Sequence, residues 1–343
     1  MNSGKAVNLP CLFSPYSLFD RQPVLPYNNK NSRSENPERI IMRKQRFIEK
    51  LIEGSLNQKE LTISDLPHNR RQVYKHLILN RFGTLFSVGF FNALFWLPLF
   101  GWYYFSGFYV MEKLKSSDPS QVAELLGNLM FLEYGTMVPL FCIGALGLAG
   151  MFYVIRRMCW GESVSLVHDF KKGIKQSWKQ FLLIGFLFSV AVFILEYLLH
   201  QYSLKLYESA LVNVMLYAGT IIIYLLTMMQ LIFAFPMSSL YWIGNFSLFK
   251  GSISFTFRYF PKNLLIFLIS LFPFLVFIML PSVLFRFIGI LVFLLFGAMH
   301  TAVIWTLYSH SVFDKHINRQ DYPDYVNKGI NPLEEQAESN NDK

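Results

Sequence analysis

Six long apolar runs lie between Gly83 and Tyr308, and each is close to the roughly 20 residues that a helix needs to cross a lipid bilayer. In lipid, only helices or closed barrels satisfy the hydrogen bonds of the backbone. Barrel strands alternate apolar and polar residues, whereas these runs are apolar on all sides. The sequence therefore predicts an all-α fold, a polytopic membrane bundle of six transmembrane helices. The runs occupy residues 83–105, 131–155, 181–200, 211–236, 264–280 and 287–308.

Composition agrees with a membrane protein. Charged residues make up 15% and hydrophobic residues 53% of the 343 residues, whereas a soluble domain carries about 25% charged residues. The first apolar run begins near residue 83, so no signal peptide is expected at the start. The three cysteines, Cys11, Cys142 and Cys159, form no CxxC pair. We therefore expect neither a disulfide framework nor a thiolate metal site.

The basic residues predict the orientation. Of the 31 Lys and Arg residues, 27 lie in the N-terminal segment, the loops after the second and fourth runs, and the C-terminal tail. Positively charged segments stay in the cytoplasm, so both termini are predicted to be cytoplasmic. We interpret the net charge of +9 as this topology signal together with attraction to anionic lipid. No nucleic-acid interface is predicted, because the charges are spread over four segments.

Three parts of the chain follow from this pattern. Residues 1–82 are predicted to be a cytoplasmic segment, partly disordered because the first forty residues are polar and lack an apolar period, with a short helix near 39–60. Residues 83–310 are predicted to be the transmembrane domain. Residues 311–343 are predicted to be a cytoplasmic tail, acidic after residue 331.

Two cationic side chains and a tryptophan mark the exit of the second run. Arg156 and Arg157 can reach lipid phosphates, and Trp160 suits the headgroup layer. Anchoring at the membrane surface is therefore one interpretation. Binding of an anionic ligand by Arg156 or Arg157 is the other, and both remain open from the sequence.

Basic amphipathic segments directly precede three of the runs in the sequence. Beyond the second run, apolar residues recur at helical spacing among lysines, which is typical of a helix on the inner membrane surface. Similar patterns precede the fifth run and, more weakly, the first. Three repeated units would explain this, and so would any even-numbered bundle with basic inner loops. The apolar residues are Val167, Phe170, Ile174, Trp178 and Phe181 in the first segment, and Phe249, Ile253, Phe257 and Phe260 in the second.

Polar and small residues inside the runs are candidates for function or for packing. His300 is the deepest ionisable group, and intramembrane ionisable groups often mark a site. Hydrogen bonding between helices is the alternative. Gly144, Gly147 and Gly150 would allow another helix to approach closely, or would break a helix at a binding site. We find no phosphate-binding loop, nucleophile elbow or zinc-protease motif, so neither an enzyme nor a bound cofactor is predicted.

The residues around the second and third runs follow a recognisable order. The order is a small-residue helix at Ile143-Gly144-Ala145, an aromatic exit from Met151 to Arg157, then Gly161-Glu162, Asp169-Phe170 and a basic helix with Trp178. This order resembles the YesL family of bacterial integral membrane proteins, and the resemblance extends over residues 75–310. Ala145 departs from the family, whose members often have proline there.

The resemblance implies a multi-pass protein of the bacterial plasma membrane. The family has no established activity, and its members are often linked to carbohydrate uptake in Gram-positive bacteria. We therefore expect a protein that is accessory to, or part of, a solute uptake system, with the lipid bilayer and possible ABC sugar-transporter components as partners. A scaffold that works through its cytoplasmic segment is the alternative. The candidate contact residues are Arg156, Arg157, Trp160, Glu162, Asp169, Trp178 and His300.

Overall fold

The computed structural model describes residues 61–62, 65–115, 122–203, 210–278 and 283–331. The chain divides into two units, Met1–Arg46 and Phe47–Lys343, and everything below concerns the second. The described residues form helices and no strand, which confirms the all-α fold. The helix predicted near 39–60 and the acidic end of the tail lie outside the described residues.

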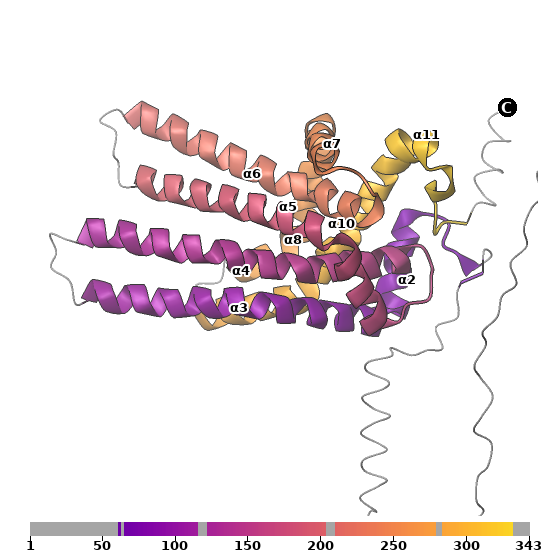
Figure 1. Cartoon of the computed structure of the whole chain (residues 1–343), viewed down its shortest axis with the longest axis horizontal. Coiled ribbons are helices and arrows are strands. Elements are labelled where there is room, and N and C mark those ends of the chain that lie inside the picture. Colours follow the sequence, from indigo (N-terminus) through magenta and orange to yellow (C-terminus); the bar gives the residue numbers. More distant parts are fainter. Residues whose placement is uncertain (1–60, 63–64, 116–121, 204–209, 279–282, 332–343) are drawn as a thin grey trace, which may run out of the picture. The chain divides into compact units, whose positions relative to one another are not determined.

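Four long helices run side by side in chain order (Figure 1): α3 (Phe82–Lys115), α4 (Val122–Cys159), α5 (Leu166–Ser203) and α6 (Ala210–Leu240). Contacts join α3 to α4, α4 to α5 and α5 to α6. Each contains an apolar stretch long enough to cross a membrane. Apolar side chains stay exposed at the far end of α6, where Leu211 is 65% and Met215 is 64% exposed. Surfaces of this kind indicate contact with the lipid bilayer.

The fifth apolar run is built differently. Helix α7 (Asn245–Arg258) meets α8 (Phe260–Ile278) at a bend of 96°. Only the two helices taken together are long and apolar enough to cross a membrane. By length and composition, the described helices could therefore cross a membrane five times, or six times if this bent pair is one span.

The last run contains one π-helical turn, and a second one follows it. Helix α9 (Val283–Val292) leads through the π-helix η2 (Phe293–Gly297) into α10 (Ala298–Phe313). A second π-helix, η3 (Asp314–Asn318), precedes the short α11 (Arg319–Asp321) and the 3₁₀ turn η4 (Pro323–Tyr325). Helix α10 packs against α4 and α6 and is largely buried. Single π-helical turns often occur at functional sites.

One end of the bundle gathers most of the polar contacts, and we call it the basic end. It comprises α2 (Arg70–Asn80), the turn between α4 and α5, the end of α6, and residues 319–331, which we call the C-terminal segment. These parts lie near one another in Figure 1. The apolar core continues into this end, where Phe152, Phe181 and Phe233 are almost fully buried. The polar contacts of the basic end therefore rest on a packed aromatic core.

One predicted detail differs from the structure. The basic pattern at residues 167–181 is not a separate surface helix, because it forms the first turns of the continuous α5. Phe170 and Phe181 of this pattern are buried, while Trp178 is 44% exposed.

Candidate functional site

The turn between α4 and α5 brings one arginine against two carboxylates. Arg157 places Nε 2.8 Å from Oε2 of Glu162 and Nη1 2.6 Å from Oδ1 of Asp169. The Asp169 side chain is only 2% exposed, and its Oδ2 accepts the backbone N–H of Ser165 at 2.8 Å. An acidic residue in the first turn of a helix also interacts favourably with the helix dipole. Asp169 therefore stabilises the start of α5 and holds the Arg157 guanidinium.

Glu162 extends this cluster to the C-terminal segment. Its Oε1 lies 3.2 Å from Nζ of Lys328, and its main-chain oxygen accepts a hydrogen bond of 3.0 Å from Arg81. Burial raises the pKa of the Glu162 carboxyl, but the hydrogen bonds and charges of Arg157 and Lys328 outweigh burial and hold this pKa below its ordinary value. The Glu162 carboxylate thus links the end of α4 to the C-terminal segment. The backbone of Glu162 binds Arg81, which directly precedes the first long helix.

Two glycines make this close approach possible. Gly161 has φ +75° and ends α4 with the two hydrogen bonds of a Schellman motif, from Gly161 N to Met158 O and from Glu162 N to Arg157 O. Gly329 has φ +87°, and a Cβ there would lie 2.2 Å from the main-chain oxygen of Cys159. The C-terminal segment can therefore lie directly against the end of α4 only with glycine at position 329.

A second polar network holds the other side of the C-terminal segment. Arg70 of α2 donates to Asp314 at 2.8 Å, and Asp314 accepts from Asn318 at 2.6 Å. Tyr241, just after α6, donates to Asn318 at 2.5 Å. Burial is the main cause that raises the pKa of Tyr241. The C-terminal segment, η3 and their two polar networks form what we call the C-terminal clasp.

Arg156, next to the paired Arg157, lies in a different environment. It is 8% exposed and donates through Nη1 to the main-chain oxygen of Ser239. Its guanidinium carbon lies 4.7 Å from the ring centroid of Tyr153 and 5.1 Å from that of Trp160. Contacts of this kind stabilise a cation that is removed from water. Among the described residues, no carboxylate forms an ion pair with Arg156, so the two arginines have separate roles.

Trp160 contacts two of the cations of this region. The Nζ of Lys328 lies 3.9 Å from the ring centroid of Trp160, while Arg156 contacts the same tryptophan. The ring of Tyr325 is 5.4 Å away. Trp160 is therefore held inside the clasp and is only partly exposed.

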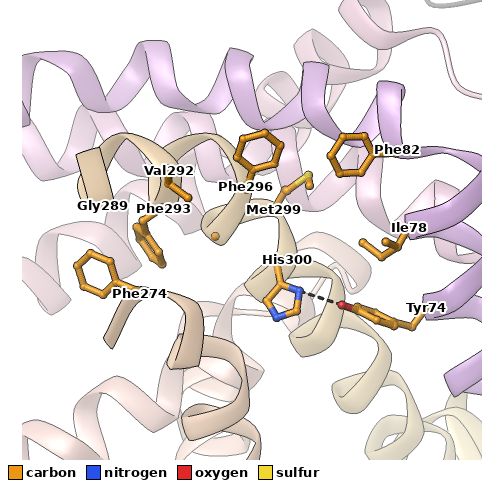
Figure 2. A pocket seen from close by; sticks show the side chains of 11 residues that line it. Tyr74, Ile78, Phe82, Phe274, Gly289, Val292, Phe293, Phe296, Met299 and His300 are labelled. Atoms are coloured by element: carbon orange, nitrogen blue, oxygen red, sulfur yellow. Dashed lines mark hydrogen bonds between the residues drawn. The ribbon is translucent and has the colours of Figure 1, made fainter. Parts of the chain in front are cut away.

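A separate pocket of about 240 Å³ lies between α2 and the π-helical stretch of the last run (Figure 2). The Tyr74 hydroxyl lies 3.0 Å from Nδ1 of His300, and these two residues are the ionisable members of the lining. Phe296 of η2 stacks on Phe82 of α3 with ring centroids 5.9 Å apart. The other lining residues are Ile78, Phe274, Gly289, Val292, Phe293, Gly297 and Met299.

The structure brings most of the predicted contact residues together. Those around the α4–α5 turn form one cluster, whereas Trp178 lies apart, with Lys179 5.6 Å above its ring. His300 belongs to the separate pocket. The sequence reasoning missed Lys328, Arg81 and Tyr74 as members of these sites. The clustered residues are Arg156, Arg157, Trp160, Glu162 and Asp169.

The three glycines of α4 face neighbouring side chains. A Cβ at Gly144 would lie 2.8 Å from Trp96, and one at Gly147 would lie 2.8 Å from Phe95, both on α3. A Cβ at Gly150 would lie 2.6 Å from Phe170 of α5. Helix α4 continues through this stretch without a break. The contacts are those of closely packed helices.

Comparison with known proteins bears on the same region. Within the part of the chain that the structure describes, no group of three His, Cys, Asp or Glu side chains could hold a metal ion. No curated protein and no solved structure matches the sequence. Residues 125–197 match the family described as "Protein of unknown function, DUF624", which is the family of the YesL-like proteins. The match covers most of α4 and α5, and therefore the turn that carries Arg157, Glu162 and Asp169.

Proposed function

We propose that the protein is a non-enzymatic accessory subunit of a solute uptake system in the bacterial plasma membrane, and that it binds its partner through the basic end. The ion pairs of the α4–α5 turn support a structural role for this end, because Arg157 and Lys328 are already neutralised by carboxylates. A carbohydrate as the solute, and ABC transporter components as the partner, rest on the family resemblance.

The observation that carries this proposal is a group of large apolar side chains exposed just after α6 and on α7, next to the part of α6 that belongs to the basic end. Trp242 is 84% and Phe246 is 81% exposed, and Ile253 and Phe257 follow on α7 at helical spacing. We call these four residues the aromatic face. Aromatic residues are enriched in the buried centres of protein interfaces.

The aromatic face is held firmly. The opposite side of α7 buries Leu248 and Phe255 in the core. The side chain of Gln180 donates to the main-chain oxygen of Ile243 at 2.8 Å and accepts from Ser238 at 2.9 Å. A surface that is already ordered loses little entropy on binding. The face therefore suits a partner better than a loosely attached helix would.

Contacts at the basic end also support six crossings. Asn331 donates to the main-chain oxygen of Pro67, and Arg70 pairs with Asp314, so the chain before α3 and the chain after α10 lie at the same end. A chain that returns to its starting side crosses the bilayer an even number of times. We infer that the bent pair α7–α8 supplies the sixth crossing, and the distribution of the basic residues supports a cytoplasmic location for both described ends.

Affinity purification in mild detergent tests the proposal. Tagged full-length protein should recover permease or ATPase subunits of an ABC transporter, identified by mass spectrometry. The double variant Trp242→Ala/Phe246→Ala should lose them. The matched control is Leu211→Ala/Val214→Ala, which removes two exposed apolar side chains from the far end of α6 and should retain the partner.

Two results would count against the proposal. Recovery of no transport component by the wild-type protein would overturn it. Equal recovery by the Trp242→Ala/Phe246→Ala variant would overturn the aromatic face as the binding surface. Deletion of residues 1–60 removes none of the described residues. Loss of the partner in that deletion alone would instead favour a scaffold that works through its N-terminal segment.

A further inference from the structure

We infer that the pocket between α2 and the last membrane run binds an anionic phospholipid, with one acyl chain in the pocket and the headgroup beside Arg71 and Lys75. This inference is independent of any protein partner. It rests on the shape and lining of the pocket, on its polar pair, and on the cations that share a helix face with that pair.

The lining is suited to a narrow apolar chain. It extends along the last run from Gly289 to His300, which are eleven residues and therefore about 16 Å apart at helical rise. Its volume of about 240 Å³ is below the roughly 300–1,000 Å³ typical of sites for drug-sized ligands. An elongated apolar space of this volume favours one chain over a compact, bulky molecule.

The polar pair lies at one end of this lining. Figure 2 shows Tyr74 and His300 joined by their hydrogen bond, with Phe274 and Gly289 at the opposite side of the view. Tyr74 belongs to α2 at the basic end. The pocket is therefore polar toward the membrane surface and apolar toward the membrane interior, as a lipid is.

His300 can present a proton to the ligand. If the Tyr74 hydroxyl donates to Nδ1, the neutral imidazole carries its proton on Nε2. None of the described residues bonds to this Nε2. An ester or phosphate oxygen of a lipid would accept that proton. The pair thus recognises an acceptor oxygen at the head of the chain.

Helix α2 supplies the charge. Residues 71, 74, 75 and 78 follow the i, i+3, i+4, i+7 pattern and lie on one helix face. Tyr74 and Ile78 line the pocket, while Arg71 and Lys75 are exposed. Cations at the membrane surface attract anionic lipid by about 1 kcal/mol each. This charge complementarity selects an anionic headgroup over a zwitterionic one.

Native mass spectrometry of the purified full-length protein tests the inference. The probes are phosphatidylglycerol and phosphatidylcholine with identical acyl chains, and palmitate alone. The wild-type protein should retain one phosphatidylglycerol at concentrations at which phosphatidylcholine and palmitate are lost. Ile78→Trp, which fills the pocket, should weaken phosphatidylglycerol binding at least about tenfold, equivalent to the loss of about 1.4 kcal/mol.

Matched variants separate the pocket from the surface. Leu79→Trp adds the same side chain to the same helix at a position that is 77% exposed and outside the lining, and should bind like wild type. Val292→Phe narrows the pocket from its other wall and should act like Ile78→Trp, so a folding defect in one variant does not decide the test. Arg71→Gln/Lys75→Gln should remove the preference for phosphatidylglycerol.

Three results would overturn the inference. Equal phosphatidylglycerol binding by Ile78→Trp, Val292→Phe and Leu79→Trp would exclude the pocket as the site. Equal retention of phosphatidylcholine by the wild-type protein would exclude recognition of the charge. Equal retention of palmitate would show that a free fatty acid, and not a phospholipid, is bound.

Discussion

At the scale of single residues, the contrast between Arg156 and Arg157 is the most informative feature. The sequence shows two identical neighbours, and it left membrane anchoring and ligand binding open for both. In the structure, Arg157 bonds to two carboxylates, whereas Arg156 is buried against aromatic rings and a carbonyl oxygen. Neighbouring positions in a helix point in different directions, so adjacent residues meet different partners. The charge pattern alone could not have separated their roles.

Replacement of Arg157 tests its structural role. Arg157→Ala leaves the buried carboxylate of Asp169 without its cation and should lower the free energy of unfolding by about 3 kcal/mol. The free energy of unfolding of Arg157→Lys should lie between those of Arg157→Ala and the wild type. A lysine keeps the charge but cannot reproduce the forked geometry of the guanidinium group. Thermal unfolding in detergent measures both. The control Lys171→Ala changes an exposed cation and should stay within about 0.5 kcal/mol. Equal stabilities of Arg157→Ala and the control would exclude the proposed role.

Acidification should release the clasp through Glu162. The pKa of this carboxyl is depressed in the folded protein, so its contribution to stability is fully present above the unfolded pKa of about 4.3. That contribution is lost as pH falls through the lower, folded pKa. At neutral pH, the wild-type protein should therefore have a higher melting temperature than Glu162→Gln. The difference between the two melting temperatures should shrink below about pH 4. A difference that is constant over this pH range would contradict the assignment.

At the scale of helices, the sequence predicted which segments are helical better than it predicted where each helix begins and ends. Apolar runs forced helices, because the backbone has no other way to satisfy its hydrogen bonds in lipid. The ends were less predictable. Helix α5 begins at Leu166 and includes the basic stretch before the apolar run, because lysines on one face do not interrupt a helix. The break between α7 and α8 falls next to Pro261, where the predicted amphipathic segment meets the fifth run, but the sequence did not predict the bend of 96°.

Packing of α4 against α5 provides a test at this scale. Gly150→Leu should destabilise the bundle by about 1–3 kcal/mol, because a Cβ at Gly150 would already lie 2.6 Å from Phe170. Gly135→Leu, on the same helix, is the control, since nothing lies within 4 Å of a Cβ there. Thermal unfolding of the two variants in one detergent should separate them. Similar melting temperatures would show that this close contact is unimportant.

At the scale of the whole molecule, long-range contacts were beyond the sequence. Arg70 and Asp314 are 244 positions apart, and Glu162 and Lys328 lie in segments with no shared pattern. Five of the seven predicted contact residues nevertheless came together, because the order from Arg156 to Asp169 is local and surrounds one turn. Contacts between residues that are close in the sequence could be predicted, whereas contacts between distant segments could not.

The central claim is that the basic end, closed by the C-terminal clasp, faces the cytoplasm after six crossings. Cysteine accessibility in intact cells tests it most directly, in a background with Cys11, Cys142 and Cys159 replaced by alanine. His168→Cys lies at the basic end, where the His168 side chain is 74% exposed, and Glu112→Cys lies at the opposite end of α3. A membrane-impermeant maleimide should label Glu112→Cys in intact cells and His168→Cys only after lysis. Labelling of His168→Cys in intact cells, with Glu112→Cys protected, would contradict the account.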